Sequence, residues 1–360
     1  MLANATKPNF CRLLSRNLLC SQHILRRAYS TSEGERLLNS FTNHESSGIP
    51  KGAGTDGPAG FELGRMHRLL DILHSPQHAW PVVHLAGSKG KGSTATMLAA
   101  ILQQSGYRVG LYTSPHVMSL RERICIDSMP VSEADFDALV LSHKDILQRA
   151  AEQEQGQLSH FEVVTALAFE HFQNAQIDIA VVEAGLGGVR DATNVFSNAN
   201  LKLAIITAIG REHEQALGGT IPAITGAKAG IMKAGRPVAL DIIWKKAEQG
   251  GPQRVHMRLI GSHQAANAAT AVAAALHLRQ DGMDKISCGP PGAGSVVAGL
   301  QQAFLQGRFQ VCRLQVGDDA EEPGPWVVLD ASRGQHLQAT SLATGKQLGC
   351  VGDQSCVRAS

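Results

Sequence analysis

The chain has 360 residues, with 33 lysines and arginines against 31 aspartates and glutamates and a formal net charge of +2. This length suffices for two domains, and the near balance of charge excludes a dedicated nucleic-acid binder, which carries a strong basic excess. The seven cysteines include no CxxC pair, so the sequence indicates neither a zinc site nor a disulfide framework. No apolar run approaches the about 20 residues of a membrane-spanning helix, so we expect no membrane partner.

The first 32 residues differ in composition from the rest of the chain. They contain five lysines and arginines, and no acidic residue precedes Glu33. Their leucines and isoleucines can form one face of a basic amphipathic helix, which is typical of an organelle transit peptide. We therefore predict a mitochondrial transit peptide over 1–32 and a matrix location, with a plastid or cytoplasmic location as the alternative. A basic helix that lies on a membrane or begins the fold is the other interpretation.

Residues 33–60 are predicted as a linker, because from Ser40 to Gly60 the chain is polar and rich in Gly, Ser and Pro. Strand-like and helix-like segments then alternate up to about Pro237. The strand-like segments include VVHLA, VGLYT, DIAVVEAGLGG and LAIITAIG. Such alternation predicts an α/β fold in which a parallel sheet carries helices on both faces, with ligands at the carboxyl ends of its strands.

The stretch AGSKGKGST, from Ala86 to Thr94, joins the predicted strand VVHLA to a predicted helix. A glycine-rich turn here leaves backbone N–H groups free at the positive end of the helix, where phosphate binds. Lys91 would contact the outer phosphates, and Ser93 or Thr94 would offer a hydroxyl near a magnesium ion. A mobile, solvated turn is the alternative. The residues predicted to bind the nucleotide are Gly87, Ser88, Lys89, Gly90, Lys91, Gly92, Ser93 and Thr94.

Polar side chains follow three of the predicted strands. Ser114 follows LYT, Glu183 lies in AVVEAG, and Glu212 and His213 follow IITAIG. A hydroxyl, carboxylates and an imidazole suit a magnesium ion that keeps a position for a phosphate oxygen. Each residue also has an ordinary structural interpretation, such as an ion pair between Glu183 and Arg190.

Two lysines, Lys228 and Lys233, lie in the stretch GAKAGIMKAG. A lysine near other cations has a lowered pKa, and its neutral amine can add carbon dioxide to form a carbamate. The carbamate is negatively charged and could bridge metal ions. The alternative is a solvated lysine at the end of a helix.

The stretch SHFEVVTALAFEHF predicts a helix, with Ser159 and Glu162 in the spacing of a capping box. Phe161, at the entry of this helix, either belongs to the core or stacks on an aromatic substrate. The sequence leaves both interpretations open.

These motifs, taken in order, resemble one family, the folylpolyglutamate synthase and dihydrofolate synthase branch of the Mur ligase-like enzymes. The matching stretches are VVHLAGSKGKGSTATMLA, GYRVGLYTSPH, RERICID, FEVVTALAF, VVEAGLGGVRDATNV, ITAIGREHEQALGGTI, AKAGIMKAGRPV and GSHQAANAATAVAA. The resemblance implies a Mur ligase-like P-loop domain with a parallel sheet at 61–260 and a smaller α/β, Rossmann-like domain at 261–360. It implies an ATP-dependent ligase that converts a pteroate or folate carboxylate to an acyl phosphate, from which the amine of L-glutamate displaces phosphate.

The resemblance also assigns metal-binding and catalytic roles. It implies that Ser114, Glu183 and His213 hold magnesium, and that Lys228 is carbamylated and serves a second magnesium ion. Lys91, His213 and Lys228 are the predicted catalytic residues. The expected partners are ATP, dihydropteroate or folate, and L-glutamate, and we expect a monomer.

Further site residues follow from the resemblance. Phe161 and Glu162 match the FE segment near the pterin site and are the predicted substrate-binding residues. Asn267, Arg308 and Asp330 are the predicted nucleotide-binding residues of the smaller domain, and Asp330 stands in a motif that matches the family only in part.

The sequence also departs from the family pattern. Between Pro237 and Gly261 a short segment replaces a much longer one, Ala331 and Arg333 replace a glycine and a histidine, and the tail after about Gln338 shows no regular pattern. The second domain is therefore expected to be incomplete, with an irregular tail. The stretches GLGGVRDATN and GREHEQALGG favour a plant-type mitochondrial dihydrofolate synthase. The alternatives are a folylpolyglutamate synthase only, or a truncated, weakly active or inactive nucleotide- or pterin-binding isoform.

Overall fold

The computed structural model describes residues 32–240, 255, 257–259, 261–288 and 294–305, and four strands at 310–313, 326–330, 337–341 and 347–351. The predicted transit peptide lies outside these residues except for Ser32. Within the described ranges, no helix combines the length and apolar character needed to cross a membrane.

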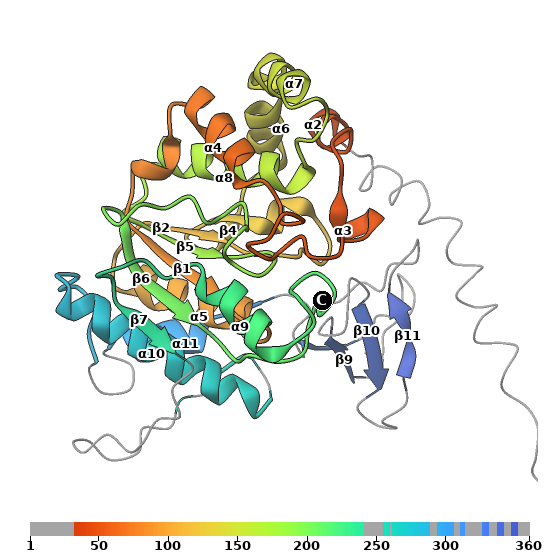
Figure 1. Cartoon of the computed structure of the whole chain (residues 1–360). Coiled ribbons are helices and arrows are strands. Elements are labelled where there is room, and N and C mark those ends of the chain that lie inside the picture. The colour runs from red at the N-terminus through yellow and green to blue at the C-terminus, as the bar shows by residue number, and fades with distance from the viewer. Residues whose placement is uncertain are drawn as a thin grey trace, which may run out of the picture.

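A seven-stranded sheet runs through the centre of the fold (Figure 1). Its strands are β1 (Val82–Ala86), β2 (Val109–Tyr112), β3 (Ile124–Ile126), β4 (Met129–Pro130), β5 (Ile179–Glu183), β6 (Leu201–Ile206) and β7 (Val238–Leu240). In the order β4-β3-β2-β5-β1-β6-β7, the strands from β2 to β7 pair in parallel, and β3 and β4 add an antiparallel hairpin at one edge. Parallel neighbours need crossover connections, which the helical segments supply. The predicted α/β fold with a parallel sheet is therefore confirmed.

One face of this sheet is covered by helices from the N-terminal half of the chain (Figure 1). They are α2 (Glu33–Leu38), α4 (Leu63–Ile72), α6 (Glu133–Ser142), α7 (Lys144–Gln153) and α8 (His160–Asn174). Val82 of β1 and Val182 of β5 belong to the core on this face, together with Met66 of α4 and Phe169 of α8. Successive strand residues point to opposite faces, and Val83 and Val181 accordingly belong to the core on the other face.

The opposite face is covered by α5 (Lys91–Gln104), α10 (His263–Gln280) and α11 (Ser295–Gln302). Val83 of β1 packs there with Ala271 of α10. Helix α11 lies very close to α5, because a Cβ on Gly299 would be 2.4 Å from the Cα of Ile101. Helices α10 and α11 thus share a core with the first sheet, although they follow the predicted boundary at residue 260. The domain boundaries stay a prediction.

The C-terminal strands form a second sheet. They are β8 (Gln310–Arg313), β9 (Trp326–Asp330), β10 (Leu337–Ser341) and β11 (Gln347–Val351), in the order β11-β10-β9-β8. All three pairings are antiparallel, which differs from the expected Rossmann-like pattern. A parallel pair needs a crossover of about a dozen residues or more, and only residues 331–336 and 342–346 separate the last three strands. The tail after about Gln338, expected to be irregular, also contains strand residues, because β10 extends to Ser341 and β11 covers Gln347–Val351.

The segment at 33–60, predicted as a linker, is packed into the fold. Ala53 has no exposed surface, and the Gly54 N–H donates a hydrogen bond to the Ala216 carbonyl at 3.0 Å. Its composition resembles that of a linker, but contacts with a loop distant in sequence stabilise it. We call residues 43–61 the N-terminal strap.

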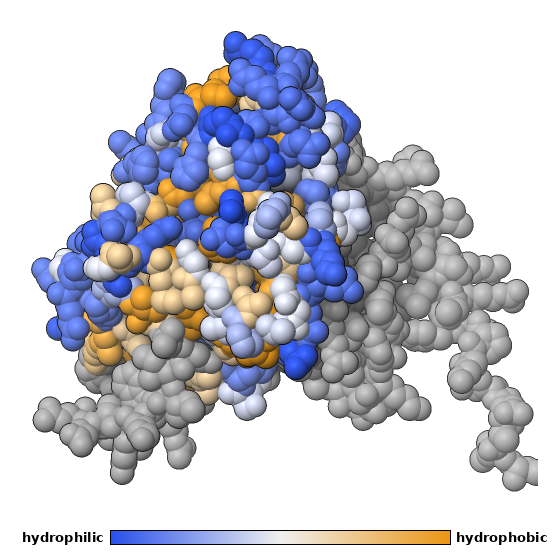
Figure 2. All heavy atoms as spheres, viewed as in Figure 1, coloured by the Kyte–Doolittle hydropathy of each residue, from blue (hydrophilic) through white to orange (hydrophobic). Residues whose placement is uncertain are grey.

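Four short elements complete the described fold: α3 (His44–Ser47), η1 (Pro76–His78), η2 (Leu120–Arg123) and α9 (Ile221–Ala229). Figure 2 shows hydrophilic residues over the end of the molecule that α4, α6 and α7 form, and more apolar residues around α9. Ile221 in α9 and Met232 just after it are exposed apolar residues.

The two helical layers described above enclose the sheet, and the carboxyl ends of its parallel strands share one edge.

Candidate active site

A cleft of about 860 Å³ opens where the carboxyl ends of the parallel strands meet the N-terminal strap. Most of the residues that the sequence predicts for the site line it. They are Ser88, Lys89, Gly90, Lys91, Gly92, Ser93, Ser114, Phe161, Glu162, Glu183, His213 and Asn267. Of the hydroxyls at the start of α5, Ser93 lines the cleft, whereas Thr94 is fully buried.

The loop between β1 and α5 has a backbone that requires glycine. Gly87 and Gly90 have φ values of +151° and +91°. A Cβ on Gly87 would lie 1.9 Å from Thr207 Oγ1, and a Cβ on Gly90 would lie 2.3 Å from Asn267 Oδ1. Glycine is therefore needed both for the left-handed conformation and for the close approach of neighbours.

The start of α5 leaves backbone donors for a ligand. The N–H groups of Ser88 and Lys89 donate to the Ala208 carbonyl at 2.9 and 3.3 Å. Those of residues 90–93 donate to no acceptor within the described part of the chain. Four adjacent donors at the positive end of a 14-residue helix suit a phosphate group.

Two lysines converge on the Gly87 carbonyl. Lys91 Nζ donates to this oxygen at 3.1 Å and lies 3.6 Å from Glu183 Oε1. Lys228 Nζ donates to the same oxygen at 2.7 Å, and its side chain is buried. Burial and the nearby Lys91 charge lower the pKa of Lys228 to about 8. This concentration of positive charge favours an anionic ligand.

Ser114 and Glu183 come together although 69 residues separate them in the chain. Ser114 follows β2 and Glu183 ends β5, and these strands are neighbours. The Ser114 N–H donates to Glu183 Oε2 at 3.3 Å, and Glu183 is buried. One carboxylate therefore lies between the Lys91 ammonium and the Ser114 loop.

The loop after β6 brings Glu212 and His213 to the same cleft. His213 has a φ of +49°, and partial burial lowers its pKa. Glu212 Oε2 is buried and has no hydrogen-bond partner within the described part of the chain. An unpaired buried carboxylate oxygen is costly without a ligand, so Glu212 is a further candidate residue of the site.

The donor set fits a magnesium ion. No three His, Cys, Asp or Glu side chains gather as a metal cage among the described residues. Magnesium does not require such a cage, since it keeps several waters and binds one or two carboxylates together with substrate phosphates. The Ser114 hydroxyl, the Glu183 carboxylate and the unpaired Glu212 oxygen are oxygen donors of this kind.

Phe161 lines the cleft and also contacts the core. Its ring centroid lies 6.2 Å from that of Tyr112, and a Cβ on Gly185 would lie 2.6 Å from Phe161 Cζ. The glycine thus leaves room for the ring beside the GLGG turn. One face of the cleft is therefore aromatic.

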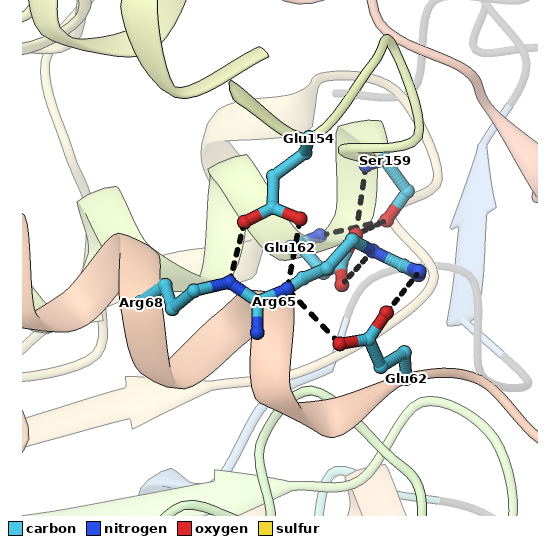
Figure 3. A network of polar contacts seen from close by, with 6 residues as sticks. All are labelled: Glu62, Arg65, Arg68, Glu154, Ser159 and Glu162. Carbon is cyan, nitrogen blue, oxygen red and sulfur yellow. Dashed lines mark hydrogen bonds and ion pairs between the residues drawn. The ribbon is translucent and has the colours of Figure 1, made fainter. Parts of the chain in front are cut away.

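Both carboxylate oxygens of Glu162 accept hydrogen bonds from other residues of the protein (Figure 3). Its Oε2 accepts hydrogen bonds from the Ser159 N–H at 2.8 Å and the Ser159 hydroxyl at 2.7 Å, which completes the predicted capping box of α8. Its Oε1 accepts from Arg65 Nε at 3.2 Å. In the same network, Arg68 pairs with Glu154 and Glu62. The contacts of Glu162 are those of a residue that positions α8 and α4 beside the cleft.

Of the three site residues predicted in the smaller domain, the structure places one, Asn267, at the cleft. Asn267 of α10 lies against Gly90, and its Nδ2 donates to Gln264 Oε1 at 2.8 Å. Arg308 lies outside the described residues, and Asp330 is the last residue of β9. The roles of all these residues stay predictions.

The sequence alone did not identify several residues that line the cleft. His44 and Phe61 of the strap line it, with ring centroids 5.1 Å apart. Arg65, Arg190 and Gln264 also line it. His44, Phe61 and Arg65 lie outside the matching stretches, whereas Arg190 and Gln264 lie within them without an assigned role. The linker-like composition of the strap concealed its packing.

Comparisons with known proteins agree with this geometry. The family model described as the Mur ligase middle domain matches residues 85–250. The chain is 33% identical over 290 residues to the dihydrofolate synthase/folylpolyglutamate synthase of Bacillus subtilis. The matched region covers 69% of this chain and 66% of that protein. The chain thus spans just under two thirds of the length of this relative.

Solved structures are similar as well. A folylpolyglutamate synthase in complex with the ATP analogue AMPPCP matches with a TM-score of 0.65 and 28% identity, over 83% of this chain and 75% of that one. A bifunctional folylpolyglutamate synthase/dihydrofolate synthase from Yersinia pestis, complexed with AMPPNP and a manganese ion, matches with a TM-score of 0.57 and 28% identity, over 71% of this chain and 65% of that one.

Proposed function

We propose that this chain, which belongs to the dihydrofolate synthase/folylpolyglutamate synthase family of Mur ligase-like proteins, is an ATP-dependent ligase that joins L-glutamate to dihydropteroate. One observation carries the proposal. The glycine loop, Lys91, the Ser114 and Glu183 pair and the aromatic wall at Phe161 all meet in one cleft. The cleft thus offers positive charge for a triphosphate, oxygen donors for a metal ion and an apolar surface for a ring.

The residues of the loop would bind and position ATP. The free N–H groups of residues 90–93 would hold phosphate oxygens. The Lys91 ammonium would exchange its contact with the Gly87 carbonyl for the phosphate that is transferred, where negative charge develops. The related folylpolyglutamate synthase solved in complex with AMPPCP supports nucleotide binding.

Ser114, Glu183 and His213 would hold magnesium, with Glu212 as a further donor. When bound, the metal would neutralise phosphate charge and fix its orientation. The Yersinia pestis relative, solved with AMPPNP and manganese, supports a divalent cation. Lys228 is the proposed site of carbamylation, because a pKa of about 8 leaves part of its amine neutral near physiological pH. The carbamate would replace a positive charge beside Lys91 with a negative one and could serve a second magnesium ion.

The proposed reaction has two steps. A carboxylate oxygen of dihydropteroate attacks the γ-phosphorus of ATP, the bond to the β,γ-bridging oxygen breaks, and ADP leaves. The amine nitrogen of L-glutamate then attacks the acyl carbon, the acyl carbon–oxygen bond breaks, and phosphate leaves while the nitrogen loses a proton. Enclosure of the cleft would keep water from the acyl phosphate.

The choice of dihydropteroate over folates already bearing glutamate rests on the GLGGVRDATN and GREHEQALGG stretches. Folylpolyglutamate synthase activity is the second candidate, and the Bacillus subtilis relative carries both names. We further propose a location in the mitochondrial matrix, on the composition of residues 1–32.

An assay of the purified chain tests the proposal. We expect ADP formation from ATP that requires both dihydropteroate and L-glutamate. Tight ATP binding without ADP formation would instead support a nucleotide-binding protein, and activity with tetrahydrofolate but not with dihydropteroate would support a folylpolyglutamate synthase.

A further inference from the structure

Two arginines line the cleft, and the protein holds them differently. Arg65 Nε donates to Glu162 Oε1 at 3.2 Å, and the side chains of this pair are only 12% and 7% exposed. Arg190 donates to Asp56 at 2.8 Å, but the side chain of Asp56 is 70% exposed and that of Arg190 is 32% exposed. Of the two, Arg190 has the partner that solvent or a ligand can reach.

The pairing of Arg190 with Asp56 is also geometrically incomplete. Both contacting nitrogens, Nε and one terminal nitrogen, approach the same oxygen, Oδ1, at 2.8 Å. Asp56 Oδ2 has no partner within the described part of the chain, so the paired contacts of a guanidinium fork with both carboxylate oxygens are not formed. An exposed ion pair of this kind is populated only a few-fold over its open form.

The surroundings of Asp56 allow the pair to open. Asp56 lies in the N-terminal strap on a turn that the Gly52 and Gly54 N–H groups fix to the carbonyls of Gln215 and Ala216. These backbone bonds hold the turn without the Asp56 side chain. The carboxylate can therefore leave Arg190 while the strap stays in place.

We propose that Arg190 binds a carboxylate of the substrate and that Asp56 competes with that carboxylate for it. The inference rests on the proposed function, because dihydropteroate carries one carboxylate and L-glutamate carries two. A ligand carboxylate in the cleft would contact the same guanidinium nitrogens and release Asp56 to solvent. In this role Arg190 determines which carboxylate substrate binds and how it is oriented.

Competition predicts opposite effects of two substitutions. Arg190→Gln removes the cation, so we expect the KM for one carboxylate substrate to rise about tenfold or more. Asp56→Asn removes the competitor, so we expect the same KM to fall about two- to fivefold, as the fraction of Arg190 that is free increases. The KM for ATP should stay within twofold in both variants. Measurements with L-glutamate varied and with dihydropteroate varied identify which substrate supplies the carboxylate.

The control is Asp281→Asn, which breaks an exposed ion pair with Lys202 of 2.9 Å that lies outside the residues lining the cleft. We expect it to change no KM. A purely structural pair would make Asp56→Asn and Arg190→Gln act in the same direction, and that result would overturn the inference, as would two unchanged carboxylate KM values in an active ligase.

Equilibrium binding separates this inference from the proposed function. L-Glutamate and dihydropteroate are titrated into the full chain saturated with a non-hydrolysable ATP analogue and magnesium. If the affinity for one of these ligands falls in Arg190→Gln and rises in Asp56→Asn, and no turnover is found, the result would support the carboxylate site while contradicting the ligase. If the wild-type chain binds neither probe, the carboxylate site is wrong as well.

Discussion

The Gly87 carbonyl oxygen accepts hydrogen bonds from two ammonium groups. These two residues concentrate positive charge at the glycine loop. Lys91 and Lys228 come from distant parts of the chain, yet both lie within 3.1 Å of that oxygen. Like charges at this separation repel, and the buried Glu183 beside Lys91 offsets only part of the repulsion. A bound triphosphate would neutralise the excess positive charge.

Lys91→Ala tests the assignment of the loop. We expect the fold to remain and nucleotide-dependent turnover to fall roughly 10²- to 10³-fold, because the ammonium offsets charge that develops during phosphoryl transfer. Steady-state ADP formation and the melting temperature check this. The matched control is Lys144→Ala, at an exposed lysine of α7 away from the cleft. Near-normal turnover in Lys91→Ala would show that this loop is not catalytic.

Lys228 should make stability depend on pH in a definite direction. Burial lowers its pKa from 10.5 to about 8, so between these values the unfolded chain binds a proton that the folded chain does not. Stability should therefore rise with pH from about 8 to 10.5, by up to roughly 3 kcal/mol. Urea unfolding in buffer free of carbon dioxide, compared between the wild type and Lys228→Met, isolates this contribution. A difference between the two proteins that stays constant over this range would contradict it.

At the scale of elements, an ion pair between a buried arginine and a half-buried glutamate anchors the N-terminal strap. Arg123, at the end of η2, is 1% exposed and donates to both oxygens of Glu45 in α3 and to His116 Nδ1 at 3.0 Å. Burial opposes the charge of Glu45, but Arg123 holds the pKa of this carboxyl below its usual 4.5. The pair therefore stabilises the fold above pH 4.5, and this contribution is lost as the pH falls further.

Glu45→Gln should lower the free energy of unfolding by about 2 kcal/mol at pH 7, because it leaves the buried Arg123 guanidinium without its counter-charge. The difference from the wild type should shrink below pH 4.5. Asp281→Asn, at an exposed pair, serves as control and should change the free energy of unfolding by less than about 1 kcal/mol. Equal small effects of the two substitutions would mean that the pair does not hold the strap.

Elements whose structure depends on residues near them in the sequence could be predicted, whereas elements that depend on residues far away in the sequence could not. The strand at 82–86, the glycine loop and α5 depend on local signals, namely an apolar run and glycines. The approach of Ser114 to Glu183 followed from parallel neighbours that end at one edge of the sheet. The strap was missed because its stability comes from contacts with a loop more than 150 residues away. Composition cannot reveal such contacts.

The whole molecule is expected to carry an import signal in front of the folded region. Removal of the residues before about Ser30 should leave the ligase-like region folded and abolish uptake by isolated mitochondria, because the basic amphipathic segment lies there. Protease protection after incubation with mitochondria measures uptake, and the full chain is the control. Uptake of the shortened chain would refute the transit peptide.

In the proposed reaction, the ligase activates a carboxylate by phosphorylating it. Dihydropteroate labelled with oxygen-18 in its carboxylate tests this directly. When the labelled oxygen attacks the γ-phosphorus, it becomes the bridging oxygen of the acyl phosphate, and it leaves with phosphate when L-glutamate attacks the acyl carbon. Mass spectrometry of the released phosphate should find one oxygen-18 atom for each ADP formed. Phosphate without the label, released together with ADP, would contradict an acyl phosphate intermediate.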